Sequence, residues 1–342
     1  MQWLSKKIES EKNMVAWLGA LTLLFSYAEL FIPRIVPFFR LGLANVAVLM
    51  GLSLSPLSFA MLLFIKAFCS SMMGGTLFTP FFFISLMQSV ISGFVMYVLF
   101  HVDGLFASGK KEETTANSNR YVSFFGISVA GAGASAVVQI ELCRIYLGQG
   151  TLVLLGPMLL FSVLSGIVTA AIKYALPLPP TAPVLEQLPL SAASVKTSSK
   201  ILLWAKLLSL IFAVIIIFTL DSWKILLPVM IVCLVLQRLS GRKIKFLPYM
   251  MLWVFIIITS LFEPQGKIIF ALWKIKITYG ALMSGITKVM IMTSVSALSQ
   301  CVAGLKFYNE KSLISQVFLN YQKMIEKWKN SKGNFLEKLQ IF

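Results

Sequence analysis

Charged and metal-binding side chains are scarce in this chain. Only 13% of its 342 residues are charged, it has one histidine (His101), and its four cysteines, Cys69, Cys143, Cys233 and Cys301, stand singly with no CxxC spacing. Soluble domains carry about a quarter charged residues, and structural metal sites need clustered Cys and His ligands. These scarcities argue against a water-soluble fold, a metal cluster and a disulfide framework.

Two enzymatic motifs are also missing. No stretch reads GxxxxGK followed by Ser or Thr, the loop that cradles ATP phosphates. The two aspartates, Asp103 and Asp221, lie far apart, so no DDxxD-like cluster can hold Mg²⁺ against a prenyl diphosphate. We therefore expect no catalytic residue, no metal and no cofactor, and we expect any ATP hydrolysis to be done by another polypeptide.

Apolar residues are abundant instead: they make up 58% of the chain, and the mean hydropathy is +0.85. A helix needs about 20 apolar residues to cross a bilayer, and such stretches recur along the sequence. The sequence predicts an all-α polytopic membrane protein with about ten transmembrane helices. The expected spans are 14–32, 41–54, 56–73, 81–100, 121–147, 151–176, 201–220, 224–236, 246–262 and 281–303.

A proline-rich stretch, LPLPPTAP, interrupts these helices and is followed by a run of Ser, Ala and Lys. Such a stretch can neither span lipid nor pack a core, so it marks a linker. We predict a six-helix substrate-binding module over residues 1–176, the linker over 177–200, a second transmembrane module over 201–305 and a cytoplasmic tail over 306–342.

Basic residues outnumber acidic ones by 30 to 13, giving a formal net charge of +17. Most lie in short segments between apolar runs, where they report membrane topology and anionic headgroups rather than nucleic acid. If both termini lie on the cytoplasmic side of a bacterial cytoplasmic membrane, every large basic cluster lies on that side too. The exceptions are Lys267, Lys274 and Lys276, which this path places outside or at the interface.

The tail contains an amphipathic helix pattern. Apolar residues recur every three or four positions with lysines between them, at Leu313, Val317, Tyr321, Met324 and Trp328. Two interpretations fit equally well: a helix lying on anionic headgroups, and a docking surface for a cytoplasmic partner.

Ionisable and polar groups at membrane depth are costly, so they are default candidates for a binding site. Glu29, Asn45, Lys66 and Glu141 lie inside or at the ends of apolar segments, although Glu29 could sit at the interface and Lys66 could snorkel to it. The glycines of MMGGTLFTP would let backbone amides approach a ligand. The predicted substrate-binding residues are Glu29, Arg40, Asn45, Lys66, Gly74, Gly75, Thr76 and Gln139.

Small residues one turn apart allow helices to approach closely in membranes. Ala16, Gly19 and Ala20 form such a face on the first helix. A denser run in the fifth helix, GISVAGAGA, favours tight packing over a ligand role.

Three segments resemble the Gx transporter family, also called heptaprenyl diphosphate synthase component I. They are AELFIPRIVPFFRLGLANVAVL, GGTLFTPFFFISLMQSVISGFVMY and FFGISVAGAGASAVVQI, and the resemblance covers about residues 14–176. The family is similar to the substrate-binding subunits of energy-coupling factor transporters, which bind a vitamin-like molecule. The resemblance implies that an AxxxA pattern, here Ala16 and Ala20, contacts a shared membrane subunit.

The second half faintly resembles the transmembrane coupling subunit of those transporters, in WAKLLSLI and in ITYGALMSGITKVMIMTSVSALS. Lys288 stands where that subunit usually has arginine. The long cytoplasmic coupling motifs are absent, unless the helix of residues 306–342 does their work in reduced form. The resemblance implies a partner-facing surface that includes Arg238, Arg242 and Lys243.

Two functions follow as expectations. The first is a membrane subunit of an ATP-driven uptake transporter that binds a small vitamin-like or isoprenoid-related substrate. It would work with cytoplasmic ATPase subunits, with or without a separate coupling subunit. The alternative is a non-catalytic accessory or anchor subunit in prenyl diphosphate, quinone or flavin-linked redox metabolism.

Overall fold

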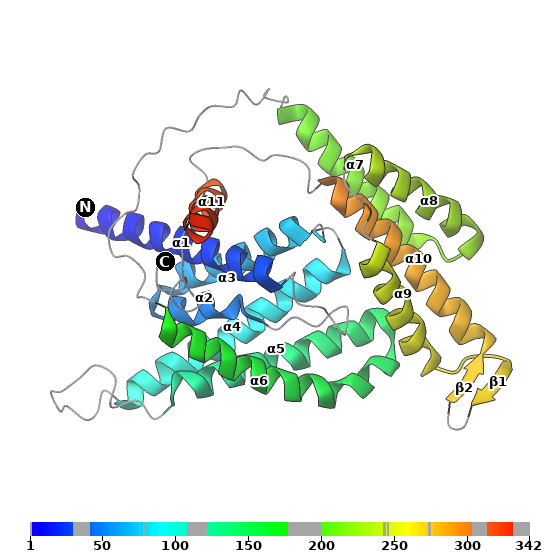
Figure 1. The fold of residues 1–342 in the computed structure, drawn as a ribbon, viewed down its shortest axis with the longest axis horizontal. Coiled ribbons are helices and arrows are strands. Elements are labelled where there is room, and N and C mark those ends of the chain that lie inside the picture. The colour runs from blue at the N-terminus through cyan, green and yellow to red at the C-terminus, as the bar shows by residue number, and fades with distance from the viewer. Residues whose placement is uncertain are drawn as a thin grey trace.

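The computed structural model describes residues 2–29, 42–74, 76–77, 79–107, 122–176, 200–241, 244, 246–272, 275–302 and 313–330. Nearly all of these residues are helical, and the protein is an all-α polytopic membrane protein as expected. Its helices form two bundles that lie side by side (Figure 1).

The N-terminal bundle consists of six α-helices and two short 3₁₀ helices. In chain order they are α1 (Gln2–Glu29), α2 (Asn45–Met50), η1 (Gly51–Ser53), α3 (Pro56–Gly74), α4 (Pro80–Ala107), α5 (Phe124–Leu147), η2 (Gln149–Leu154) and α6 (Leu155–Ala175). Helix α5 packs between α4 and α6, and α1 packs on α2 and α3.

Serine side chains join α4, α5 and α6 where the small residues bring their backbones close. Ser92 on α4 donates to the carbonyl of Gly131 at 2.8 Å, and Ser128 on α5 donates to the carbonyl of Gly166 at 2.7 Å. A Cβ added at Gly131 would collide with Met96. The small-residue run of the fifth helix therefore serves packing, as its sequence favoured.

The C-terminal bundle consists of α7 (Lys200–Thr219), α8 (Trp223–Leu239), α9 (Phe246–Leu261) and α10 (Tyr279–Val302). Helix α10 is its centre, because α7, α8 and α9 all pack on it. Leu226, Val295 and Leu298 are almost fully buried in the shared core.

A short antiparallel hairpin, which the apolar spacing does not predict, joins α9 to α10. Its strands are β1 (Ile268–Leu272) and β2 (Ile275–Thr278), rich in the β-branched isoleucine that favours strands. Thr278 closes its base by accepting the backbone N–H of Gln265 at 2.9 Å. Figure 1 shows the hairpin projecting from the end of the C-terminal bundle.

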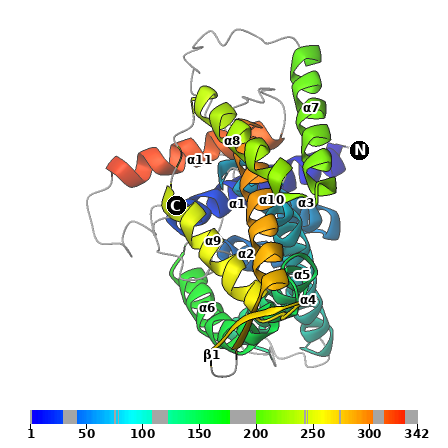
Figure 2. The same ribbon diagram turned by 90° about the vertical axis from the view of Figure 1, so that its right-hand side faces the viewer.

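The amphipathic helix of the tail, α11 (Leu313–Asn330), does not extend away from the molecule. It packs across α1 of the N-terminal bundle, as both ribbon views show (Figures 1 and 2). Val317, Tyr321 and Met324 are at most 8% exposed and join the core of α1, α2 and α3. The apolar stripe therefore contacts this chain's own first helix.

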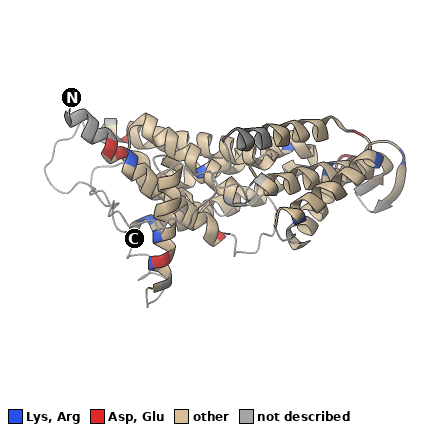
Figure 3. Cartoon of the chain, turned by 90° about the horizontal axis from the view of Figure 1, so that it is seen from above, with Lys and Arg blue, Asp and Glu red and all other residues tan. Residues whose placement is uncertain are grey.

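Four described helices are long and apolar enough to cross a membrane: Pro80–Gly104, Phe124–Leu147, Gln149–Ala175 and Tyr279–Cys301. Three shorter apolar helices accompany them, within Pro56–Met72, Leu208–Thr219 and Tyr249–Leu261. The outer faces carry large apolar side chains, such as Phe94 at 65% and Leu160 at 71% exposure, as expected for contact with lipid. Charged side chains are sparse along most helices and gather on α1 and α11 (Figure 3). This is the architecture of a multi-pass membrane protein.

The second expected span, 41–54, is shorter than predicted. Helix α2 has six residues and η1 three, which together rise only about 14 Å against the roughly 30 Å of a hydrocarbon core. Gly42, with φ +75°, lies just before α2. At the other end, η1 stops at Ser53, shortly before α3 begins at Pro56. The segment is therefore a half-span that is covered by protein, and all of α2 except Met50 is buried.

Candidate functional site

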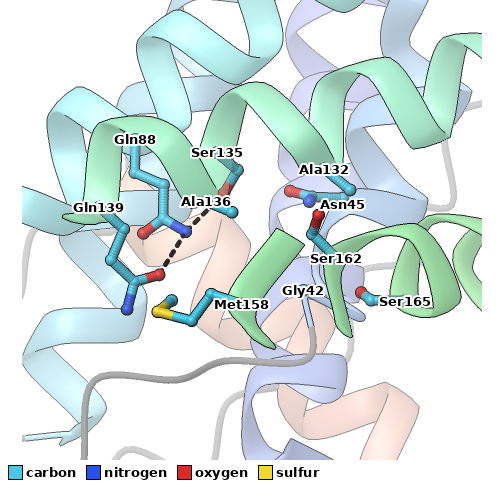
Figure 4. A pocket seen from close by; sticks show the side chains of 10 residues that line it. All are labelled: Gly42, Asn45, Gln88, Ala132, Ser135, Ala136, Gln139, Met158, Ser162 and Ser165. Carbon is cyan, nitrogen blue, oxygen red and sulfur yellow. Dashed lines mark hydrogen bonds between the residues drawn. The ribbon is translucent and has the colours of Figure 1, made fainter. Parts of the chain in front are cut away.

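A polar pocket lies inside the N-terminal bundle, between α2, α4, α5 and α6 (Figure 4). The space inside it that the centre of a water-sized sphere can occupy is about 20 Å³, enough for about one water molecule, so the pocket is narrow in this structure. Carboxamides, hydroxyls and small or apolar side chains line it: Gly42, Asn45, Gln88, Ala132, Ser135, Ala136, Gln139, Met158, Ser162 and Ser165.

Gln88 organises one side of the pocket. Its Nε2 donates to Ser135 Oγ at 2.5 Å and to Gln139 Oε1 at 3.2 Å, linking α4 to α5. Figure 4 shows the two carboxamides turned toward each other above the sulfur of Met158. Because Ser135 and Gln139 are one turn apart on α5, one glutamine can bond both. The network fixes the orientation of all three side chains.

Asn45 forms the other side, at the start of α2. Lys66 Nζ on α3 donates to Asn45 Oδ1, which turns the amide nitrogen toward the Gly42 side. A Cβ at Gly42 would lie 3.1 Å from Asn45 Nδ2, so glycine leaves this wall open besides supplying its positive φ. The result is an oriented N–H donor beside the cavity.

Glu29 lies just behind this wall. Its carboxylate, 6% exposed, accepts the backbone N–H of Leu43 at 2.5 Å and so ties the end of α1 to the segment that carries Gly42 and Asn45. Buried carboxylates are stable only with such donors. Glu29 therefore positions a pocket wall.

The structure brings together some of the predicted substrate-binding residues. Asn45 and Gln139 line the pocket. Lys66 donates to Asn45, and Glu29 accepts the backbone N–H of Leu43 behind the pocket wall. Gly74 ends α3, and Thr76, whose N–H donates to the carbonyl of Ser71 at 2.9 Å, closes the turn that follows; neither lines the pocket.

Arg40 and Gly75 lie outside the described residues. Glu141, also considered from sequence, is about half exposed and pairs with Arg144 at 3.3 Å on the surface of α5.

Four polar lining residues were not predicted: Gln88, Ser135, Ser162 and Ser165. Gln88 carries the same signal that identified Gln139, a carboxamide inside an apolar run. The two serines of α6 are three residues apart and share a helix face, a weaker signal because serine can satisfy itself within a helix. Ser162 does so, donating to the carbonyl of Leu159 at 2.7 Å.

The small-residue face of α1, predicted as a partner interface, is buried, and α11 lies against it at Gly19. Ala16 and Ala20 are at most 2% exposed, and a Cβ at Gly19 would lie 2.8 Å from Val317 Cγ2. Burial, together with the neighbouring phenol of Tyr27, raises the pKa of Tyr321 on α11 to about 12, so this side chain is neutral in the interface.

The basic part of the predicted partner-facing surface is only partly visible. Arg238 is exposed at the end of α8, whereas Arg242 and Lys243 lie outside the described residues. Among the residues that the structure places, no group of three His, Cys, Asp or Glu side chains could hold a metal ion. The chemistry available in the pocket is therefore hydrogen bonding.

Two family models match the chain, one for each bundle. Residues 18–176 match the family described as heptaprenyl diphosphate synthase component I, and residues 199–303 match a domain of unknown function (DUF8519). No curated protein and no solved structure matches the chain. The first match runs from residue 18, within α1, to the end of α6 and includes every residue that lines the pocket, as the resemblance of residues 14–176 implied.

Proposed function

We propose that this protein is the membrane subunit of an ATP-driven uptake transporter of the energy-coupling factor type. The N-terminal bundle would bind a small substrate, and the C-terminal bundle with α11 would connect it to cytoplasmic ATPase subunits. The observation that carries the proposal is the pocket itself: three oriented carboxamides and three serines converge inside a membrane bundle. Polar groups at membrane depth are costly and are typical of substrate paths.

The lining chemistry favours a vitamin-like substrate over a prenyl diphosphate. The ten lining residues supply N–H donors, hydroxyls and the sulfur of Met158 but carry no formal charge. Diphosphate groups are usually held by Mg²⁺ with carboxylates or by clustered Arg and Lys. Lys66, which is not among these lining residues, donates its amine to Asn45. A small molecule with amide-like donors and acceptors matches these groups best.

The contact between α11 and α1 supports the coupling role. In the related transporters, the small-residue face of the first helix contacts a separate membrane subunit, and here Gly19 lies against Val317 of the chain's own α11. We infer that α11 supplies in the same chain the contact that another subunit makes elsewhere. Movement of α11 would then act directly on α1 and, through Glu29, on the pocket wall.

Hydrolysis of ATP would come from partner subunits, because the chain has no phosphate-binding loop motif. The C-terminal bundle and the exposed cytoplasmic charges, Arg238 among them, are the surfaces available to such partners. The orientation with both termini inside belongs to the same proposal.

The test is purification of the tagged full-length protein from its native membrane in mild detergent, with mass spectrometry of the co-purifying proteins and small molecules. The proposal expects ATPase subunits together with a polar compound that is released on denaturation. The Q88L variant should lose that compound about tenfold or more, because it removes the two hydrogen bonds by which Gln88 orients Ser135 and Gln139. A matched surface variant, E141Q, should retain it.

Recovery of a soluble prenyl synthase or a redox partner, without ATPases, would instead establish the accessory-subunit alternative. Retention of the compound by Q88L at the wild-type level would place the binding site elsewhere in the chain.

A further inference from the structure

The turn between α5 and α6 is inserted into the C-terminal bundle. Leu147, the last residue of α5, is 2% exposed and packs among Leu252 and Ile256 of α9 and Val289 and Met292 of α10. Figure 1 shows the shared end of α5 and α6 meeting α9 and α10. This contact joins the two segments that separate family models match.

Two polar contacts flank this apolar one. Lys288 Nζ on α10 donates to the carbonyl of Leu147 at 2.9 Å, and Glu263, just after α9, accepts the backbone N–H of Gln149. The last carbonyls of a helix lack partners within it and carry partial negative charge, so a lysine suits this position. Lys288 of the C-terminal bundle thus binds a carbonyl at the end of α5, and Glu263 of the same bundle binds a backbone N–H of the turn that follows.

Glycines allow the close approach. Gly148 has φ +104°, and a Cβ there would collide with the Glu263 carboxylate. A Cβ at Gly150 would collide with the backbone carbonyl of Thr259, which cannot turn away as a flexible side chain could. The backbone of the turn at Gly150 therefore lies directly against the backbone of α9 at Thr259.

Apolar packing alone would hold the bundles together more simply. Lys288 lies within the apolar helix Tyr279–Cys301, where a cation is costly and an apolar side chain would pack at no electrostatic cost. A lysine beside the α5 terminus therefore serves a role that apolar packing does not fill.

The location of the pocket on α5 and α6 indicates that role. Helices α5 and α6 carry seven of its ten lining residues, and Gln139 lies eight residues, about 12 Å along the helix, from Leu147. We propose that Lys288 and Glu263 are positioning residues that clamp the α5–α6 turn and thereby set how far the pocket opens. The C-terminal bundle thus controls access to the pocket of the N-terminal bundle. That the clamp controls access of a substrate rests on the proposed function, whereas its effect on the opening of the pocket does not.

The experiment uses the full-length protein in lipid nanodiscs and needs no substrate. A cysteine placed at Ser162 reports pocket access through its rate of labelling by N-ethylmaleimide, with the parent chain as the blank for the four native cysteines. Hydrogen exchange of the peptide around Gln149 reports whether the clamp is closed.

K288M and G150A, each in the S162C background, should change the labelling rate by at least about threefold and speed exchange at Gln149. Two controls match these substitutions. K224M removes a lysine of α8 that lies near its neighbour Trp223, and G156A adds a methyl where nothing lies within 4 Å. Both should leave the labelling rate unchanged, and K288R, which keeps a cationic donor, should restore the K288M rate toward wild type.

The outcomes separate cleanly. Faster exchange at Gln149 with unchanged labelling in both K288M and G150A would overturn the proposal and leave the contact as packing alone. If K288M or G150A fails to fold, E263Q tests the other half of the clamp with the same two readouts and the same criteria. Because no ATPase or substrate is involved, loss of the proposed transport function would leave these results standing, and the reverse also holds.

Discussion

Substitution of Gly19 by alanine tests the packing of α11 on α1. The new methyl would lie 2.8 Å from Val317 Cγ2 and 3.1 Å from Ile65 Cγ2, so it is held between two helices. Overpacking of this kind costs about 1–3 kcal/mol. The higher helix propensity of alanine does not offset this cost, because α1 stays helical when α11 opens. The expectation is destabilisation of the α11 contact by about 1 kcal/mol or more.

The V317A background should reverse that sign. Val317 is fully buried, so removing two methyl groups costs about 1.6 kcal/mol from transfer alone and more from the cavity. The methyl that G19A adds would then enter the vacated space. G19A should therefore stabilise the V317A protein by about 1 kcal/mol, which gives a coupling energy of about 2 kcal/mol in the double-mutant cycle.

Native-state hydrogen exchange of the amides in residues 313–330 measures the opening free energy of α11 for all four proteins of the cycle. G104A, where nothing lies within 4 Å of the added Cβ, controls for helix propensity. An effect of G19A that is the same in both backgrounds to within about 0.5 kcal/mol would refute the packing that we describe.

Three further predictions concern the pocket wall and α11. E29Q should release the compound that co-purifies with the protein about fivefold more readily, because it weakens the bond that holds Leu43; wild-type retention by mass spectrometry would remove Glu29 from the wall. G42A should lower stability by about 1–2 kcal/mol because of its φ of +75°, whereas G133A on α5, which has open space, should not; denaturant titration of the two variants decides. Since the pKa of Tyr321 is raised by burial, its neutral form supports α11 packing fully below pH 10, and this support is lost as the pH rises toward 12; Y321F should flatten that part of a melting-temperature series.

The fold class could be predicted from the sequence because apolar runs of helix length have few alternatives in a bilayer. Each of the ten expected segments overlaps a described helix. Spacing alone did not show that α2 is a half-span, because an apolar run does not by itself mark where a helix begins and ends. Nor did the 3–4 spacing in the tail reveal which surface its apolar stripe contacts, because amphipathicity encodes the stripe and not its partner.

The candidate site was accessible to the same reasoning only in part. Asn45 and Gln139 were identified because a carboxamide in lipid demands a partner, and Gln88 obeys the same rule. The serines of α6 could not be singled out, since a serine inside a helix can bond its own backbone, as Ser162 does. Glu29 was expected to meet a ligand directly, but the structure shows it bonding the backbone of Leu43. Tertiary contacts between distant segments decide such cases.

Transport by the purified complex is the decisive measurement for the proposed uptake function. The protein and the ATPase subunits that co-purify with it would be reconstituted in liposomes, and movement of the co-purifying compound across the membrane would be followed with and without ATP on the ATPase side. We predict accumulation that requires ATP and is abolished by Q88L but preserved by E141Q. Equal movement with and without ATP, or a complex that binds the compound yet never moves it, would contradict the account.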